Sequence, residues 1–191
     1  SAPFHEKFGL RVNHRYVGTE VPTPPSGDAS FTIFIDSDGK IKAKNNTTGR
    51  IDYSGSNPAA VLQSTIDALA KTGGTIVLAR GTYIWQSVCT LPKDLPYWLK
   101  IVGDSEVTIQ LTAKGPRAFD FHKTVDYDTF RNIWLENLTI DCNNVGGQHH
   151  VVVGTYVNGS TQMRINLQDI VIRGITTKNV PVDPTLVKDR E

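Results

Sequence analysis

The residues whose types and spacing could do chemistry lie near the middle of the chain, at Trp134, Glu136 and Asp141. An exposed aromatic ring beside a carboxylate can stack on a sugar ring and accept hydrogen bonds from its hydroxyl groups. Alternation along the surrounding apolar run places Ile133 and Leu135 inside, so Trp134 and Glu136 are expected to point outward. The sequence therefore predicts carbohydrate contact at Trp134 and Glu136. The same ring can instead pack against a neighbouring chain or the N-terminal part of this one.

Asp141 is a third candidate for the carbohydrate site, although Asp-Cys-Asn-Asn also makes an ordinary turn at the end of a strand. Adjacent histidines point to opposite sides of a strand, so His149 and His150 seldom bind one ion together, and no third ligand is evident. Asp36 and Asp38 are spaced like the start of a calcium loop but lack the later ligands and the closing Glu. We therefore expect no metal and no cofactor, and nothing in the sequence supports calcium.

The composition of the chain limits the classes of protein to which it can belong. The 191 residues carry 20 Lys and Arg against 19 Asp and Glu, a formal charge of +1 that excludes a strongly basic nucleic-acid binder. No apolar run approaches the roughly 18–20 residues that cross a bilayer, so no membrane span is expected. Cys89 and Cys142 are too few for a disulfide framework, and two buried free thiols are favoured over one bridge. Plentiful Gly, Asn, Ser and Thr favour a turn-rich all-β protein.

The elements that must position these residues follow an N-terminal arm. Residues 1–29 combine an apolar first half with a proline-rich end, so we expect this arm to pack on the body or on a neighbouring subunit. Residues 30–56 predict a β-hairpin that turns at an Asp-Gly pair, followed by a lead-in. One helix is expected from about Pro58 to Lys71, with Asn57 as its N-cap and one apolar stripe.

A repeat then predicts how the later strands are arranged. Asn132–Thr139 lines up with Asp169–Thr176 at a displacement of 37 residues, so that aliphatic residues coincide. Asn137 and Gly174 stand at the bend of each copy, and these residue types best tolerate a left-handed backbone. Leu99–Gly103 is a looser copy, again with Gly at the bend. The repeat predicts stacked coils in which each strand pairs in parallel with its copies.

Segments spread over most of the chain are similar to one known family; they are Lys44–Gly55, Ala59–Leu69, Gly73–Leu78, Arg80–Tyr83, Leu99–Gly103 and Asn137–Asp141. They resemble right-handed parallel β-helix proteins of the pectate lyase-like superfamily, whose helix caps the N-terminal end of the solenoid. The resemblance implies an all-β fold for residues 57–181, a short right-handed single-stranded parallel β-helix with an N-terminal capping helix and a preceding hairpin. Residues 182–191 are then a polar C-terminal tail.

The family divides between enzymes that cut acidic polysaccharides and non-enzymatic or receptor-binding spikes of virus tails and cell surfaces. Polygalacturonase-like members use Asn-Thr-Asp, Asp-Asp, Gly-His-Gly and Arg-Ile-Lys; this chain lacks the first three, and Arg164-Ile165-Asn166 lacks the lysine of the fourth. Glycosidic cleavage needs two facing carboxylates, whereas Asp141 is the one family-style acid. No acidic cluster matches the calcium site of the lyases. With about three or four coils, catalysis by this chain alone is not expected.

The expected function is that of a non-enzymatic structural component of a virion or cell surface, a spike, fibre or decoration subunit that assembles and touches carbohydrate. The alternative is a polysaccharide lyase or glycoside hydrolase acting on acidic polysaccharide, truncated or with a site shared between subunits. Because the tail at 182–191 has no apolar stripe to seal the last coil, we expect another subunit or a continuation to cover it. The expected partners are therefore further copies or another structural subunit, and the expected location is extracellular.

Overall fold

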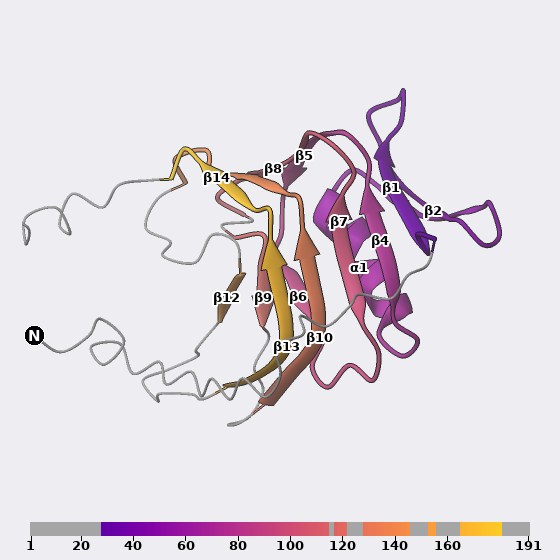
Figure 1. Cartoon of the computed structure of the whole chain (residues 1–191). Coiled ribbons are helices and arrows are strands. Elements are labelled where there is room, and N and C mark those ends of the chain that lie inside the picture. The colour runs from indigo at the N-terminus through magenta and orange to yellow at the C-terminus, as the bar shows by residue number, and fades with distance from the viewer. Residues whose placement is uncertain (1–27, 115–116, 122–127, 146–152, 156–164, 181–191) are drawn as a thin grey trace, which may run out of the picture.

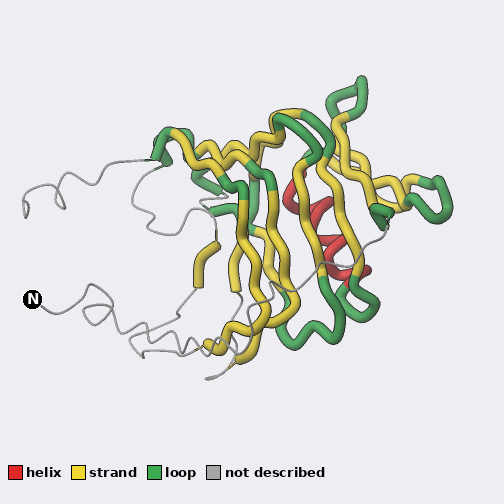
Figure 2. Tube along the Cα trace, in the orientation of Figure 1, coloured by secondary structure: helices red, strands yellow, loops and turns green. Residues whose placement is uncertain are grey.

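The computed structural model describes the chain over residues 28–114, 117–121, 128–145, 153–155 and 165–180 (Figure 1). Over these ranges the protein is mostly β, with fourteen strands and one helix. Figure 2 shows that helix lying behind the strands of the largest sheet. The prediction of an all-β architecture with a single helix is confirmed.

The strands form three sheets. The largest is mixed, in the order β13-β10-β7-β4-β1-β2-β3, with β1 Phe31–Ile35, β2 Ile41–Asn45, β3 Ile51–Gly55, β4 Gly74–Leu78, β7 Leu99–Gly103, β10 Asp128–Glu136 and β13 Ile165–Arg173. The second is β14-β11-β8-β5, with β5 Gly81–Trp85, β8 Val107–Leu111, β11 Thr139–Asp141 and β14 Thr176–Lys178. The third is β12-β9-β6, with β6 Cys89–Leu91, β9 Phe119–Phe121 and β12 Val153–Thr155.

From β4 onward the chain visits the three sheets in turn, and each strand pairs in parallel with the strand of the previous visit. This stacking aligns equivalent side chains. Ile76 of β4 pairs with Ile101 of β7, which pairs with Leu135 of β10, and Leu135 pairs with Ile172 of β13. The first three are fully buried in one core. We call these four residues the Ile76 column.

The register and the corners of the predicted repeat are confirmed. Ile133 of β10 pairs with Ile170 of β13, 37 residues later, as the alignment required. Asn137 and Gly174 both have left-handed backbones, with φ of 54° and 60°. Gly103 at the earlier bend has no positive φ, and it is needed for another reason: a Cβ there would overlap the carbonyl oxygen of Asn137, which follows the neighbouring strand β10.

The predicted hairpin is also present. β1 and β2 pair antiparallel around a turn in which Gly39, at φ 76°, donates its N–H to the carbonyl of Asp36 at 2.9 Å. The lead-in that follows is itself a strand, β3, which the sequence did not predict. Since β1 pairs in parallel with β4, through Phe31 and Ile76, the hairpin extends the large sheet beyond β4.

The helix α1 (Pro58–Leu69) begins as predicted and ends two residues before Lys71. Asn57 caps it, because its Oδ1 accepts the N–H of Ala59 at 3.1 Å. Gly73, at φ 68°, closes its end by donating to the carbonyl of Leu69 at 2.8 Å. The buried face of α1 packs against β2, β3, β5 and β6, so the helix covers the core at the end away from β13.

Several sequence-based predictions concern residues outside the described ranges. They are the docking of the arm up to residue 27, the tail at 182–191 and the loop with His149 and His150. Within the described ranges no helix is long and apolar enough to cross a membrane. Cys89 and Cys142 are both buried and free, which confirms the expectation of unbridged thiols.

Candidate functional site on the outer face of the large sheet

Strands β7, β10 and β13 bring polar and aromatic side chains together on the face of the large sheet that points away from the core. The register sets Lys100 beside Trp134 and sets Glu136 beside Arg173, and Trp98 stands just before β7. We call these five residues the Glu136 cluster. It contains two of the three predicted site residues, Trp134 and Glu136.

The carboxylate of Glu136 is the centre of this cluster. Its Oε1 accepts hydrogen bonds from Nε and Nη2 of Arg173 at 2.8 and 2.6 Å. Its Oε2 accepts from Nζ of Lys100 at 2.8 Å and from the indole N–H of Trp134 at 2.9 Å. Four donors on three neighbouring strands therefore saturate both oxygens, which explains how a carboxylate with only 8% of its surface exposed is tolerated.

The expectation that Trp134 is exposed is wrong. The ring does lie outside the aliphatic core, as alternation required, yet only 1% of its surface is accessible. Trp98 meets it edge to face, with ring centroids 5.9 Å apart, while Arg173 and Lys100 lie 4.8 and 5.5 Å from its centroid. These contacts leave no open ring face for a sugar: Trp134 packs against side chains of its own sheet and of the loop before β7, a packing that neither the predicted sugar contact nor the predicted contact with a neighbouring chain or the N-terminal arm described.

The same contacts set the ionisation of Glu136. Burial opposes its ionisation, but the hydrogen bonds from Lys100, Arg173 and Trp134 outweigh burial and lower its pKa to about 2. A carboxylate that is ionised at neutral pH and already saturated by four donors cannot act as a general acid there. The arrangement holds three strands together electrostatically, and no second carboxylate belongs to the cluster.

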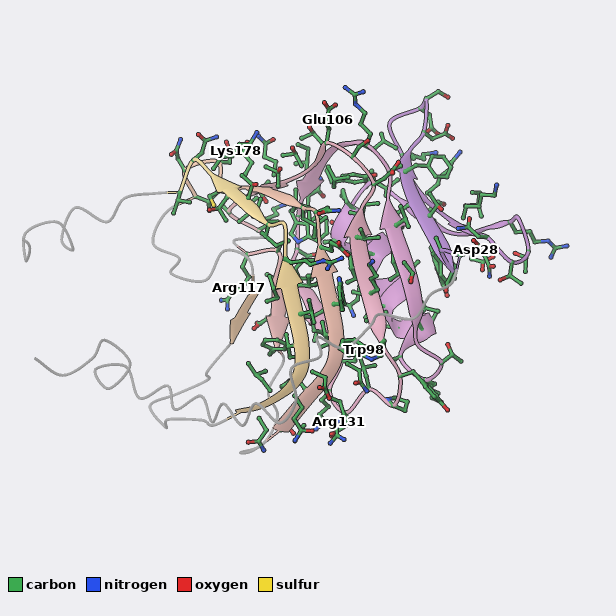
Figure 3. The ribbon with its side chains drawn as sticks, in the orientation of Figure 1. Asp28, Trp98, Glu106, Arg117, Arg131 and Lys178 are labelled. Carbon is green, nitrogen blue, oxygen red and sulfur yellow. The ribbon has the colours of Figure 1, made fainter. Side chains whose placement is uncertain are left out.

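Asp141, the third predicted site residue, lies elsewhere. It ends β11 in the four-stranded sheet, so the structure does not bring it to the Glu136 cluster. Its Oδ1 accepts the N–H of Asn143 at 3.0 Å and the amide of Asn179 at 2.8 Å, and Lys178 lies 3.5 Å from Oδ2. Burial opposes ionisation of Asp141, yet these partners lower its pKa. Figure 3 shows Lys178 at this edge, well away from Trp98.

Three members of the Glu136 cluster, Trp98, Lys100 and Arg173, were missed by reasoning from the sequence. The signal for Arg173 was present, because the 37-residue repeat that aligned Leu135 with Ile172 also places Arg173 beside Glu136. Lys100 follows in the same way from the looser copy at β7. In the part of the chain that the structure describes, no group of three His, Cys, Asp or Glu side chains could hold a metal ion.

Comparisons with family models, with curated proteins and with solved structures found no match to this chain. The geometry therefore defines the class by itself: a mostly β protein of parallel, stacked strands, with an aliphatic interior and a saturated ionic cluster on its outer face. Its function has to be argued from that geometry.

Proposed function

We propose that the chain is a short right-handed parallel β-helix, capped by α1, and that it serves as a non-enzymatic structural component of an extracellular or virion assembly. The recurring order of strands through three sheets supports a helical coil. The position of α1, which covers the core at the end away from β13, supports its role as a cap. The resemblance to pectate lyase-like proteins, noted from the sequence, points the same way.

The observation that carries the assembly role is the exposure of aliphatic side chains on β13. Leu167 and Ile172 are each 46% exposed, whereas their register partners on β10, Phe130 and Leu135, are fully buried. Among the described strands, β13 has a neighbour on one side only. Apolar side chains on an unpaired strand edge are a favourable surface for another chain. We infer that a further copy of this chain covers the last coil.

The ionic groups on the outside support a structural role over a catalytic one. Hydrolysis of a glycosidic bond uses an acid that is protonated near neutral pH and a second carboxylate about 5–10 Å from it. Glu136 and Asp141 belong to different sheets, both have lowered pKa values, and both are occupied by nearby donors. Contact with carbohydrate stays a prediction.

Sedimentation velocity of the purified chain tests the assembly. We expect the wild type to sediment as an oligomer and Ile172→Lys as a monomer, because the lysine would place a charge in the interface. Ile84→Lys is the matched control: Ile84 is 42% exposed on β5, away from the last coil, so this variant should associate like the wild type. A wild-type monomer whose β13 amides exchange as slowly as those of β10 would contradict the proposal.

A screen for product release from acidic and neutral polysaccharides, at several calcium concentrations, tests the absence of catalysis. We expect no turnover. Turnover that Asp141→Asn abolishes would instead establish the alternative, a polysaccharide-cleaving enzyme. Binding without turnover would support a carbohydrate contact on another surface, because the ring of Trp134 is buried and its indole N–H is bonded to Glu136.

A further inference from the structure

A hollow of about 410 Å³ lies at the edge of the large sheet where β4 and β7 begin. Three segments form it: the turn after α1, the loop before β7 and the middle of β10. Its lining residues are Thr72, Gly73, Gly74, Pro96, Tyr97, Trp98 and Asn132. Tyr97 is 61% exposed, the largest exposed fraction among the big apolar side chains of the described residues.

The walls of this hollow are fixed by short-range contacts. The N–H of Gly74 donates to the carbonyl of Trp98 at 2.9 Å, and Asn132 Nδ2 donates to the carbonyl of Leu95 at 2.7 Å. Gly73 sits so close to the loop that a Cβ would lie 2.7 Å from the Trp98 carbonyl oxygen and from Tyr97 Cβ. The ring of Trp98 also rests on Trp134. The hollow is therefore preformed.

The chemistry of the lining selects among ligands. Two of its polar side chains already donate within the protein, Thr72 to the carbonyl of Gly73 and Asn132 to that of Leu95. The lining contains no charged group. By contrast, neither the indole N–H of Trp98 nor the hydroxyl of Tyr97 donates a hydrogen bond to any described residue. A sugar needs several free polar partners, whereas a polyproline II segment needs aromatic and proline surfaces and a few donors for its carbonyls.

We propose that the proline-rich segment of the same chain, residues 21–25 (Val-Pro-Thr-Pro-Pro), docks in this hollow. Prolines favour the polyproline II conformation and lose little entropy on binding. The segment lies outside the described residues, and the first described residue after it is Asp28. One turn of such a helix, three residues long, matches the spacing from Pro22 to Pro25.

The position of the residues just before β1 brings residues 21–25 within reach of the hollow. Ser30 donates its N–H to the carbonyl of Thr75 at 2.7 Å, and Asn46 holds the carbonyl of Ala29 at 2.7 Å. Parallel strands begin at the same edge, so the chain leaves β1 at the edge that carries the hollow; Figure 3 labels Asp28 and Trp98 there. From β1 to β7 is about two strand spacings, or about 10 Å, and four residues of polyproline II span about 12 Å.

Docking of residues 21–25 would hold the apolar first part of the arm at one place on the body. The inference does not depend on the assembly proposed above, because it concerns one chain and can be tested at concentrations where that chain is monomeric. If assembly at β13 were disproved, the docking proposal would be unaffected. If docking were disproved, the assembly proposal would be unaffected.

Iodide quenching of tryptophan fluorescence in the full chain tests the docking. Trp85 and Trp134 are at most 1% exposed, so the quenching reports Trp98. If the segment is docked at least half of the time, replacing Pro22, Pro24 and Pro25 by Ser raises the quenching constant at least about twofold. The matched control, Pro3→Ser, changes a proline of the same arm outside the segment and should leave quenching unchanged.

A second variant tests the pocket side. Tyr97→Ala also frees Trp98, and the proline substitutions should add nothing further in its background, because both changes remove one interaction. Unchanged quenching in the proline variant would overturn the proposal. So would additive effects of the two changes. Protection of Trp98 from iodide that grows with protein concentration would assign the hollow to the arm of another copy. Protection of Trp98 by an oligosaccharide in the wild type would assign the hollow to sugar. Either result overturns the intramolecular docking.

Discussion

Strands β10 and β13 have nearly the same pattern of residues and the same corner, yet their environments differ. Leu135 of β10 is fully buried, and its partner Ile172, 37 residues later, is 46% exposed. The two residues occupy equivalent positions in the Ile76 column. The difference arises because β10 has a strand on each side, whereas β13 has one neighbour among the described strands. Burial in a stack depends on position along the stack as well as on residue type.

The largest expected effect is a direct test of this comparison. Leu135→Ala should lower the free energy of unfolding by about 2–5 kcal/mol, because it opens a cavity in a packed core. Ile172→Ala in the monomer should cost less than about 1 kcal/mol, because the side chain is half exposed before truncation. Urea denaturation of both variants measures the difference. Equal losses would mean that Ile172 on β13 is as well packed as Leu135 on β10.

The glycines at the two corners, Gly103 at the end of β7 and Gly174 after β13, extend the comparison between the inner strands and β13. A Cβ at Gly103 would overlap the backbone carbonyl of Asn137, so Gly103→Ala should cost about 2–3 kcal/mol. A Cβ at Gly174 would meet the side-chain Oδ1 of Asn137 at 2.5 Å, in addition to the cost of a left-handed alanine, about 1–2 kcal/mol.

A double-mutant cycle separates these two causes. Asn137→Gly removes the obstructing amide and should relieve part of the Gly174→Ala loss, but it should not relieve Gly103→Ala, where the backbone obstructs. Denaturation midpoints of the single and double variants measure this. Relief of both losses, or of neither, would contradict the assignment of the contacts.

The Glu136 cluster joins β7 and β10 to β13 through an ionised carboxylate, so its contribution to the free energy of unfolding should depend on pH. Glu136→Gln should lower the free energy of unfolding at pH 7 by about 2 kcal/mol, because it weakens charge-assisted bonds from Lys100 and Arg173. The folded pKa of about 2 lies below the ordinary 4.5, so this stabilisation is present above about pH 4.5 and disappears as the pH falls toward 2. The gap between wild type and variant should therefore close over that range.

Urea titrations at pH 7, 4 and 2.5 measure that gap. Glu106→Gln is the control, because Glu106 pairs with Arg80 on the surface, with 68% of its side chain exposed, and should contribute little at any pH. A Glu136→Gln deficit that keeps its full pH 7 size at pH 2.5 would show that shape, not charge, is what the carboxylate contributes.

The smallest expected effect concerns Asp141, which ties β11 to the last coil through Asn179 and Lys178. Asp141→Asn should weaken the attachment of β14 by about 1 kcal/mol, since one hydrogen-bonded carboxylate becomes a neutral amide. Hydrogen exchange should then accelerate in β14 and stay unchanged in β8. Equal acceleration in both strands would instead indicate a global loss of stability.

Much of the fold could be predicted because its signals are local. An N-cap, a proline at the first turn and an apolar stripe located α1, and an Asp-Gly pair located the hairpin. The 37-residue repeat predicted the register of β10 and β13, including the left-handed corners at Asn137 and Gly174. The strand β3 was missed although its residues, Ile-Asp-Tyr-Ser-Gly, alternate between apolar and polar types.

The candidate site was predicted less well. Alternation placed Trp134 and Glu136 on the outer face correctly, but not their burial, since burial there depends on side chains from strands 34 and 37 residues away. Asp141 was a candidate as a family-style acid, but the chain turns at Asn137 and Asp141 lies in another sheet.

The sequence by itself determined where the helix, the hairpin and most of the later strands lie and where two left-handed corners fall, because periodicity, capping and left-handed residues act within a few positions. Only the tertiary structure decided that a carboxylate, two cations and two tryptophans meet on one face, and that equivalent aliphatic residues are buried on β10 and exposed on β13. Contacts between strands depend on stacking, which joins residues far apart in the chain, and the end of a stack has no neighbour to bury it.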